Sequence, residues 1–202
     1  MSTSSEDLRS IALAEFATAG YAGTSLHRIA DIAGLSKSTV LYHYSSKETL
    51  LEAAVAPAID RMTQILEALE VRTLSAEGRL AFLSEFVDFL LEYRREVHMF
   101  INQGPSLVDV PVIDRANELV IRLAKFFAAN TASVEEKMRF GIALGGAAYM
   151  LCTQDSLGFD NTPVEETRAA LITILTGLLA PGAASASAAT SSAATLTTAN
   201  GI

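Results

Sequence analysis

Residues 24–51, TSLHRIADIAGLSKSTVLYHYSSKETLL, constrain the fold of this chain more than any other stretch. They predict a helix, a tight turn, a short second helix and the start of a third. Gly34 can take the left-handed conformation that ends a helix, and Ser36 can cap the helix that follows. Two helices joined by a short turn containing Gly form a helix-turn-helix, whose second helix can lie in a DNA major groove.

Hydrogen-bonding side chains crowd the second of these helices. They are groups that reach phosphates or base edges, namely Lys37, Ser38, Thr39, Tyr42 and His43, with Lys47 opening the next helix. A helix used only for packing does not need so many donors. The alternative is a solvated surface helix in an ordinary bundle, which a helix-turn-helix pattern alone also fits.

The run from Ser10 to Val55 resembles the N-terminal DNA-binding domain of the tetracycline-repressor (TetR) family. The matching pieces are Phe16, Gly20-Tyr21, Thr24-Ser25, Ile29-Ala30, Ala33-Gly34-Leu35-Ser36-Lys37, Thr39, Tyr42-His43-Tyr44, Ser46-Lys47-Glu48 and Leu50. Two positions depart from the family pattern: Leu41 stands where an aromatic is frequent, and Arg28 cannot complete a capping box with Ser25.

The resemblance implies a homodimer that binds a palindromic double-stranded DNA operator and responds to a small-molecule effector. Phosphate contacts are expected from Ser25, Lys37, Thr39, Tyr42, His43 and Lys47, and base contacts from Ser38, Tyr42 and either His27 or Arg28.

The net charge of −8 argues against nucleic acid at first sight. Within residues 24–47, however, Arg28, Lys37 and Lys47 stand against Asp31 alone. Because this positive charge is local and small, we expect modest non-specific DNA affinity and a shallow salt dependence.

Composition and motifs also limit the class of protein. Cys152 is the single cysteine, the start of the chain has no signal-peptide pattern, and the longest apolar stretches are too short to span a bilayer. We therefore expect a cytoplasmic protein that does not bind membranes. No HExxH, nucleophile elbow or phosphate loop is present, so no enzyme activity, metal or cofactor is expected.

Hydrophobic periodicity predicts an all-α fold of about nine helices. We expect a helix-turn-helix domain over residues 1–52, a ligand-binding and dimerisation domain over 53–181, and a disordered Ala/Ser/Thr-rich tail over 182–202. A helix from Lys47 to about Val71 contains Pro57, which should kink it or split it in two. Another helix should run from Ser133 to about Leu157.

Small residues form a stripe near the C-terminal end. Gly141, Gly145, Ala148 and Cys152 recur at helical spacing, and mid-helix glycine costs about 1 kcal/mol relative to alanine, so a close helix approach is indicated. With the family resemblance, this stripe and Leu171, Leu175 and Leu178 of the last helix are expected to form a four-helix dimer interface. The alternative is that the stripe packs inside one subunit.

Aromatic and methionine residues gather in the middle of the chain beside a few polar groups. The resemblance implies a ligand cavity there, with candidate contacts Phe82, Phe86, Phe89, His98, Met99, Asn102, Phe126, Tyr149 and Met150. The alternative for each is plain core packing. The main hypothesis is a ligand-responsive repressor released by a largely apolar effector, and its rival is a helical small-molecule-binding protein without operator binding.

Overall fold

The computed structural model describes residues 5–71, 75–104, 107, 110–131, 133–153 and 162–180, and over these ranges the chain has helices and no strands. This confirms the all-α prediction. The nine helices of the described ranges are α1 (Ser5–Ala19), α2 (Leu26–Ala33), α3 (Lys37–His43), α4 (Lys47–Val71), α5 (Ala76–Glu92), α6 (Arg94–Gln103), α7 (Pro111–Asn130), α8 (Val134–Cys152) and α9 (Val164–Leu178).

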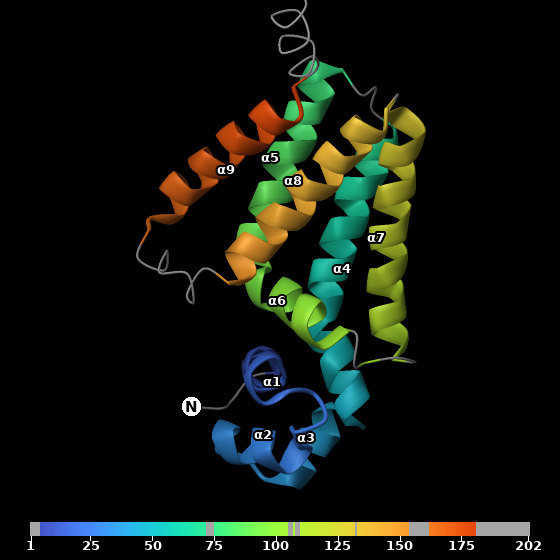
Figure 1. Cartoon of the computed structure of the whole chain (residues 1–202). Coiled ribbons are helices and arrows are strands. Elements are labelled where there is room, and N and C mark those ends of the chain that lie inside the picture. The colour runs from blue at the N-terminus through green and yellow to red at the C-terminus, as the bar shows by residue number, and fades with distance from the viewer. Residues whose placement is uncertain are drawn as a thin grey trace, which may run out of the picture.

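Helices α1 to α3 form a small unit at one end of the molecule, and α5 to α9 form a bundle at the other (Figure 1). Helix α4 belongs to both, because its first half packs with the small unit and its second half with the bundle. It continues past the exposed Pro57, so of the two expected effects of this proline, a kink or a split, the split does not occur. The predicted boundary between residues 52 and 53 therefore falls inside a continuous helix.

The turn between α2 and α3 follows from its sequence. Ser25 caps α2 by accepting a hydrogen bond from the Arg28 backbone N–H, and Ser36 caps α3 through Thr39 in the same way. Gly34 ends α2 at φ 67°, the left-handed region in which a Cβ is unfavourable. These local signals set the angle at which α3 leaves α2.

Buried apolar side chains form two clusters, one in each part of the molecule. The first gathers residues of α1, α2, α3 and the start of α4, and it also includes Met99 of α6 and Ile113 of α7. The second joins the later half of α4 to α5, α7, α8 and α9. Besides α4, the two parts are connected by α6, which packs on α1 as well as on α8, and by α7, which contributes to both clusters.

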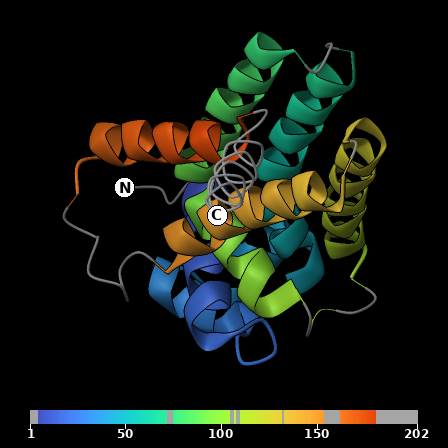
Figure 2. The ribbon, with the colours of Figure 1, turned by 45° about the horizontal axis from the view of Figure 1, so that its top comes forward.

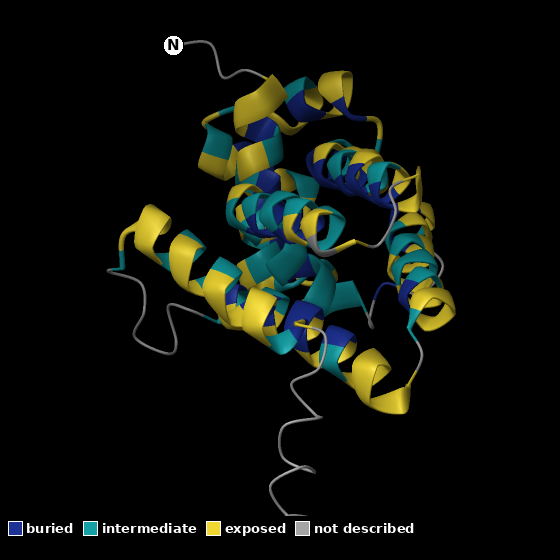
Figure 3. Ribbon diagram, turned by 90° about the horizontal axis from the view of Figure 1, so that it is seen from above, coloured by how far each residue is buried: buried dark blue, intermediate teal, exposed yellow. Residues whose placement is uncertain are grey.

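Three helices of the bundle lie side by side, with α8 between α9 and α7 (Figures 1 and 2). Exposed residues follow the outer side of α9 in the view from above (Figure 3). Helix α8 ends at Cys152, earlier than the expected Leu157, which lies outside the described residues together with the tail over 182–202. No helix of the described ranges is both long enough and apolar enough to cross a membrane.

Candidate DNA-binding surface and effector cavity

The second helix of the helix-turn-helix presents an exposed face. Lys37, Ser38, Tyr42 and His43 are exposed on α3, and the Tyr42 side chain is 87% accessible. Thr39 is half-buried, and its hydroxyl lies 2.8 Å from that of Ser36. The face therefore offers one ammonium and several hydroxyl and ring groups for contacts outside the protein.

Lys47 has a different environment from the other residues of the predicted surface. Its half-buried ammonium donates hydrogen bonds to the carbonyls of Tyr21, at 2.7 Å, and Thr24, at 3.0 Å, and lies over the Tyr21 ring. These contacts tie the loop between α1 and α2 to the start of α4. They account for Lys47 without any DNA contact.

Residues of α2 that were assigned to DNA are exposed and also have partners inside the protein. Arg28 pairs with Glu15 of α1, and this hydrogen bond raises the pKa of the guanidinium. His27 Nδ1 lies 2.9 Å from an oxygen of Asp31 one turn later. Within residues 24–47, Lys37 is thus the cation whose side chain is left without a hydrogen-bond or ion-pair partner.

Sequence reasoning did not select Leu41 or Ile32 for the surface. Both are exposed, Leu41 on α3 and Ile32 on α2. The expected contacts were hydrogen-bonding groups, which neither side chain has, and the exposure of both shows that they point outward.

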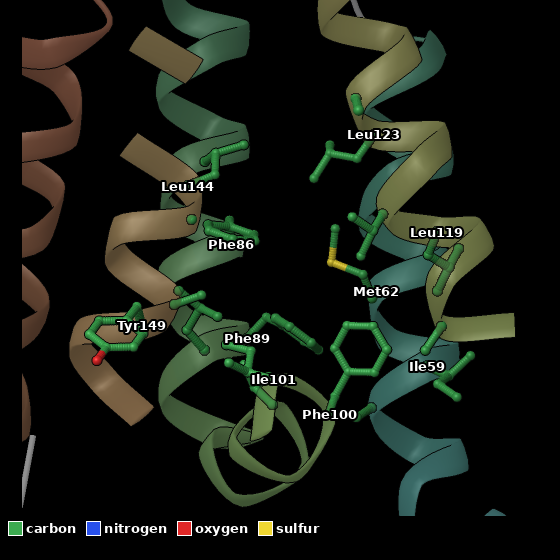
Figure 4. Close-up of a pocket in the computed structure, with 18 of the residues that line it drawn as sticks. Ile59, Met62, Phe86, Phe89, Phe100, Ile101, Leu119, Leu123, Leu144 and Tyr149 are labelled. Carbon is green, nitrogen blue, oxygen red and sulfur yellow. The ribbon is translucent and has the colours of Figure 1, made fainter. Parts of the chain in front are cut away.

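A cavity of about 740 Å³ lies inside the bundle between the two clusters of buried residues. Its walls come from α4, α5, α6, α7 and α8 (Figure 4). The lining is apolar except for Glu96, Lys137 and Tyr149, and the Tyr149 hydroxyl points away from the space. A concave site of this size and polarity suits a small, mainly hydrocarbon ligand.

Four of the predicted pocket residues line this cavity, namely Phe86, Phe89, Met99 and Tyr149. The other five lie elsewhere: Phe82 and Phe126 pack against Phe127, Asn102 donates a hydrogen bond to the His98 carbonyl, and Met150 is exposed on α8. Other residues that line the cavity were not among the predicted contacts. They include Ile59 and Met62 of α4, Leu119 and Leu123 of α7, and Leu144 of α8. Their apolar spacing was visible in the sequence, but a cavity wall and a packed core have the same spacing.

The stripe of small residues borders the cavity. Gly141, Gly145 and Ala148 all line it, and a Cβ added to either glycine would meet no atom within 4 Å. Close packing of another helix therefore does not explain these glycines within the subunit. They form the α8 edge of the cavity.

Leucines of α9 that were assigned to the dimer interface point largely inward. Leu175 is 2% accessible and belongs to the core of the bundle, while Leu171 and Leu178 pack against it. Cys152 is half-buried, and burial raises the pKa of its thiol to about 11. The exposed apolar residues on these two helices are instead Val134, Met138, Ile142, Tyr149, Met150, Val164 and Ile174.

The arrangement defines a helix-turn-helix protein whose exposed second helix is joined, through α4 and α6, to a bundle with an apolar cavity. Residues 8–54 match the sequence model described as "Bacterial regulatory proteins, tetR family". The N-terminal unit of this chain is thus similar to the N-terminal domain of the TetR family, and the relatives that the chain matches are transcriptional regulators.

Individual relatives agree with this assignment. The chain is 32% identical over 96 residues to the HTH-type transcriptional regulator RutR of Escherichia coli K12, a match that covers 48% of this chain and 43% of RutR. It is 29% identical over 118 residues to IcaR of Staphylococcus aureus strain Newman, the negative transcriptional regulator of the biofilm operon icaADBC, covering 58% and 63% of the two chains. The matched region thus spans less than half the length of RutR and less than two thirds of IcaR.

A solved structure extends the likeness to nearly the whole chain. SCO3833, a TetR-family member from Streptomyces coelicolor A3, superposes with a TM-score of 0.64 at 26% identity, over 85% of this chain and 90% of that one. The bundle, and not only the N-terminal unit, therefore has the family's architecture.

Proposed function

We propose that this protein is a transcriptional repressor that binds a palindromic operator as a homodimer and releases it when a small, largely apolar effector fills the cavity. One observation carries the proposal. Val55, Ile59, Met99 and Ile113 line the cavity and at the same time belong to the apolar core of the helix-turn-helix unit. An effector that contacts these residues contacts the packing of the DNA-binding unit.

The response to the effector follows from this shared packing. Helix α6 presents Phe100 and Ile101 to the cavity and packs against α1, while α4 carries Ile59 and Met62 on its cavity side. An effector with higher affinity for one placement of α4 and α6 shifts the population toward that placement, by no more than its differential affinity. The spacing of the two recognition helices of a dimer changes with it.

On the DNA side, α3 is the recognition helix. We assign phosphate contacts to Ser25, Lys37, Thr39, Tyr42 and His43 and base contacts to Ser38, Tyr42 and either His27 or Arg28. Lys47 supports the same surface from behind through its bonds to the α1–α2 loop. The function as a DNA-binding regulator implies that the protein acts in the cytoplasm, where the bacterial chromosome lies.

Dimerisation is assigned to the exposed apolar face of α8 and α9. Met138, Ile142 and Ile174 are exposed there, and Gly145 and Gly146 leave the α8 backbone accessible. A second copy of the same face gives an isologous interface with two-fold symmetry. Such a dimer places two recognition helices about 34–36 Å apart, in successive major grooves.

The experiment is selection from random duplex DNA by the purified protein, at two salt concentrations. An enriched palindrome with two half-sites supports the repressor, and placing that palindrome upstream of a reporter distinguishes repression from activation. If a folded dimer enriches no sequence at low salt, the operator-binding proposal fails. The acidic net charge of −8 then favours the alternative, a helical small-molecule-binding protein without operator binding.

A further inference from the structure

Glu96 is the acidic residue of the cavity wall. It lies in the first turn of α6, is half-buried, and lines a space whose other walls are mainly carbon. Among the described residues its carboxylate forms no ion pair. It accepts a hydrogen bond from its own backbone N–H, and the positive charge that acts on it is that of the adjacent, exposed Arg95. A carboxylate removed from water in this way normally has a partner.

Aromatic rings gather at the α6 end of the cavity. Phe100 follows Glu96 by one helical turn and therefore lies on the same face of α6. Phe89 and Tyr149 approach the same end from α5 and α8 (Figure 4). Faces of aromatic rings attract cations, and a carboxylate adds a full opposite charge.

Lys137, the positively charged residue of the cavity wall, lies far from these aromatic rings. Lys137 precedes Tyr149 by twelve residues on α8, which corresponds to about 18 Å along the helix axis. A ligand with a positive end is therefore attracted to the α6 end and repelled from the opposite one.

We propose that Glu96, together with the rings of Phe89, Phe100 and Tyr149 at the α6 end of the cavity, selects an effector with a positively charged nitrogen on a hydrocarbon body. This inference rests on the proposed ligand-responsive function and adds the chemical class of the ligand. Burial raises the pKa of the Glu96 carboxyl, and an ammonium group bound beside it stabilises the ionised form. The hydrocarbon body then occupies the apolar space between α4 and α7.

The test compares three probes with the same ten-carbon chain, decylamine, 1-decanol and decanoate, by displacement of the neutral dye Nile red at pH 7 without DNA. Decylamine, which is protonated at that pH, is expected to bind wild-type protein at least about tenfold more tightly than decanol, with decanoate weakest. Glu96→Gln keeps the size and shape of the side chain and removes its charge. It should weaken decylamine about tenfold and change decanol less than about threefold.

Glu92→Gln is the matched control, because Glu92 is an exposed acid near Glu96 that does not line the cavity. It should leave all three affinities unchanged. Equal affinities of wild-type protein for the three probes, tightest binding of decanoate, an equal loss for all probes in Glu96→Gln, or no binding of Nile red and the probes each overturn the inference. Because no DNA is present, this result is independent of operator selection, so the two proposals can fail separately.

Discussion

Lys37 and Lys47 each open a helix of the DNA-binding unit, but only one of them is free to reach a phosphate. Lys37 is exposed on α3, whereas the Lys47 ammonium is bound to the carbonyls of Tyr21 and Thr24. At the scale of single residues, this difference separates the proposed DNA contact, Lys37, from a lysine with a structural role, Lys47.

Replacing Lys47 by Met retains the aliphatic chain and removes the ammonium. The Thr24 carbonyl then loses its Lys47 donor, and the Tyr21 carbonyl keeps only the bond from the Thr24 backbone N–H. We expect the free energy of unfolding to fall by about 1–3 kcal/mol, measured by urea denaturation. Lys37→Met is the control, and its free energy of unfolding should stay within about 0.5 kcal/mol of wild type. On the selected operator, Lys37→Met should lower affinity and reduce the salt slope by about one. Equal stability of the two variants would contradict this division of roles.

The role of Lys47 could not be predicted from the sequence, although its presence in the motif could. Its acceptors lie 26 and 23 residues upstream, in a loop whose position depends on the packing of α1 against α4. Helix caps could be predicted from the sequence, because a capping residue and the backbone N–H that it accepts from are only three residues apart. Ser36 caps α3 as its sequence predicted, and Ser25, Ser75 and Ser133 cap α2, α5 and α8 in the same way.

At the scale of helices, hydrophobic periodicity predicted which segments form helices. It did not predict which other helix each face packs against. The glycines of α8 illustrate the difficulty, since small residues suit a close helix approach and the edge of a cavity equally well. Because Gly141 and Gly145 are four residues apart, the sequence predicts that they lie on the same face of α8. Only the position of α7 shows that this face borders the cavity. For the same reason Leu175 could not be separated from the interface leucines.

An ion pair between α5 and α9 is expected to make the free energy of unfolding depend on pH. Arg168 of α9 donates to both carboxylate oxygens of Asp88 on α5, at 2.5 and 2.9 Å, and also to the hydroxyl of Ser84. This hydrogen bond lowers the pKa of Asp88 below 3.8. A depressed folded-state pKa contributes stability that is present above the unfolded pKa and lost as pH falls through the folded one.

We therefore expect wild type to exceed Asp88→Asn in free energy of unfolding near neutral pH, by a small margin because the pair is partly exposed. That margin should shrink as pH falls below about 4. Urea denaturation of both proteins at pH 7, 5, 4 and 3 measures it. A margin that is the same at pH 3 as at pH 7 would exclude this ion pair as its source.

At the scale of the whole molecule, the proposed dimer is assigned to the exposed face of α8 and α9. Ile142 lies on that face with 67% of its side chain accessible, and Ile121 of α7 is a comparable exposed isoleucine, at 52%, on another helix. Ile142→Glu places two like charges near the two-fold axis and should convert the dimer to monomers at micromolar concentration. Sedimentation velocity measures this, with Ile121→Glu expected to remain dimeric. A dimeric Ile142→Glu, or a monomeric Ile121→Glu, would place the interface elsewhere.

The cavity shares four of its lining residues with the core of the DNA-binding unit, and this divides the lining into two kinds of position. Under the proposed function, a change at Val55, Ile59, Met99 or Ile113 alters effector binding and operator binding together, so we expect few substitutions to be tolerated there. Leu123 of α7 and Leu144 of α8 line the cavity without belonging to that core or packing against it. New effector specificities in descendants of this protein are therefore expected to arise on those outer walls, while the wall next to the DNA-binding unit stays fixed.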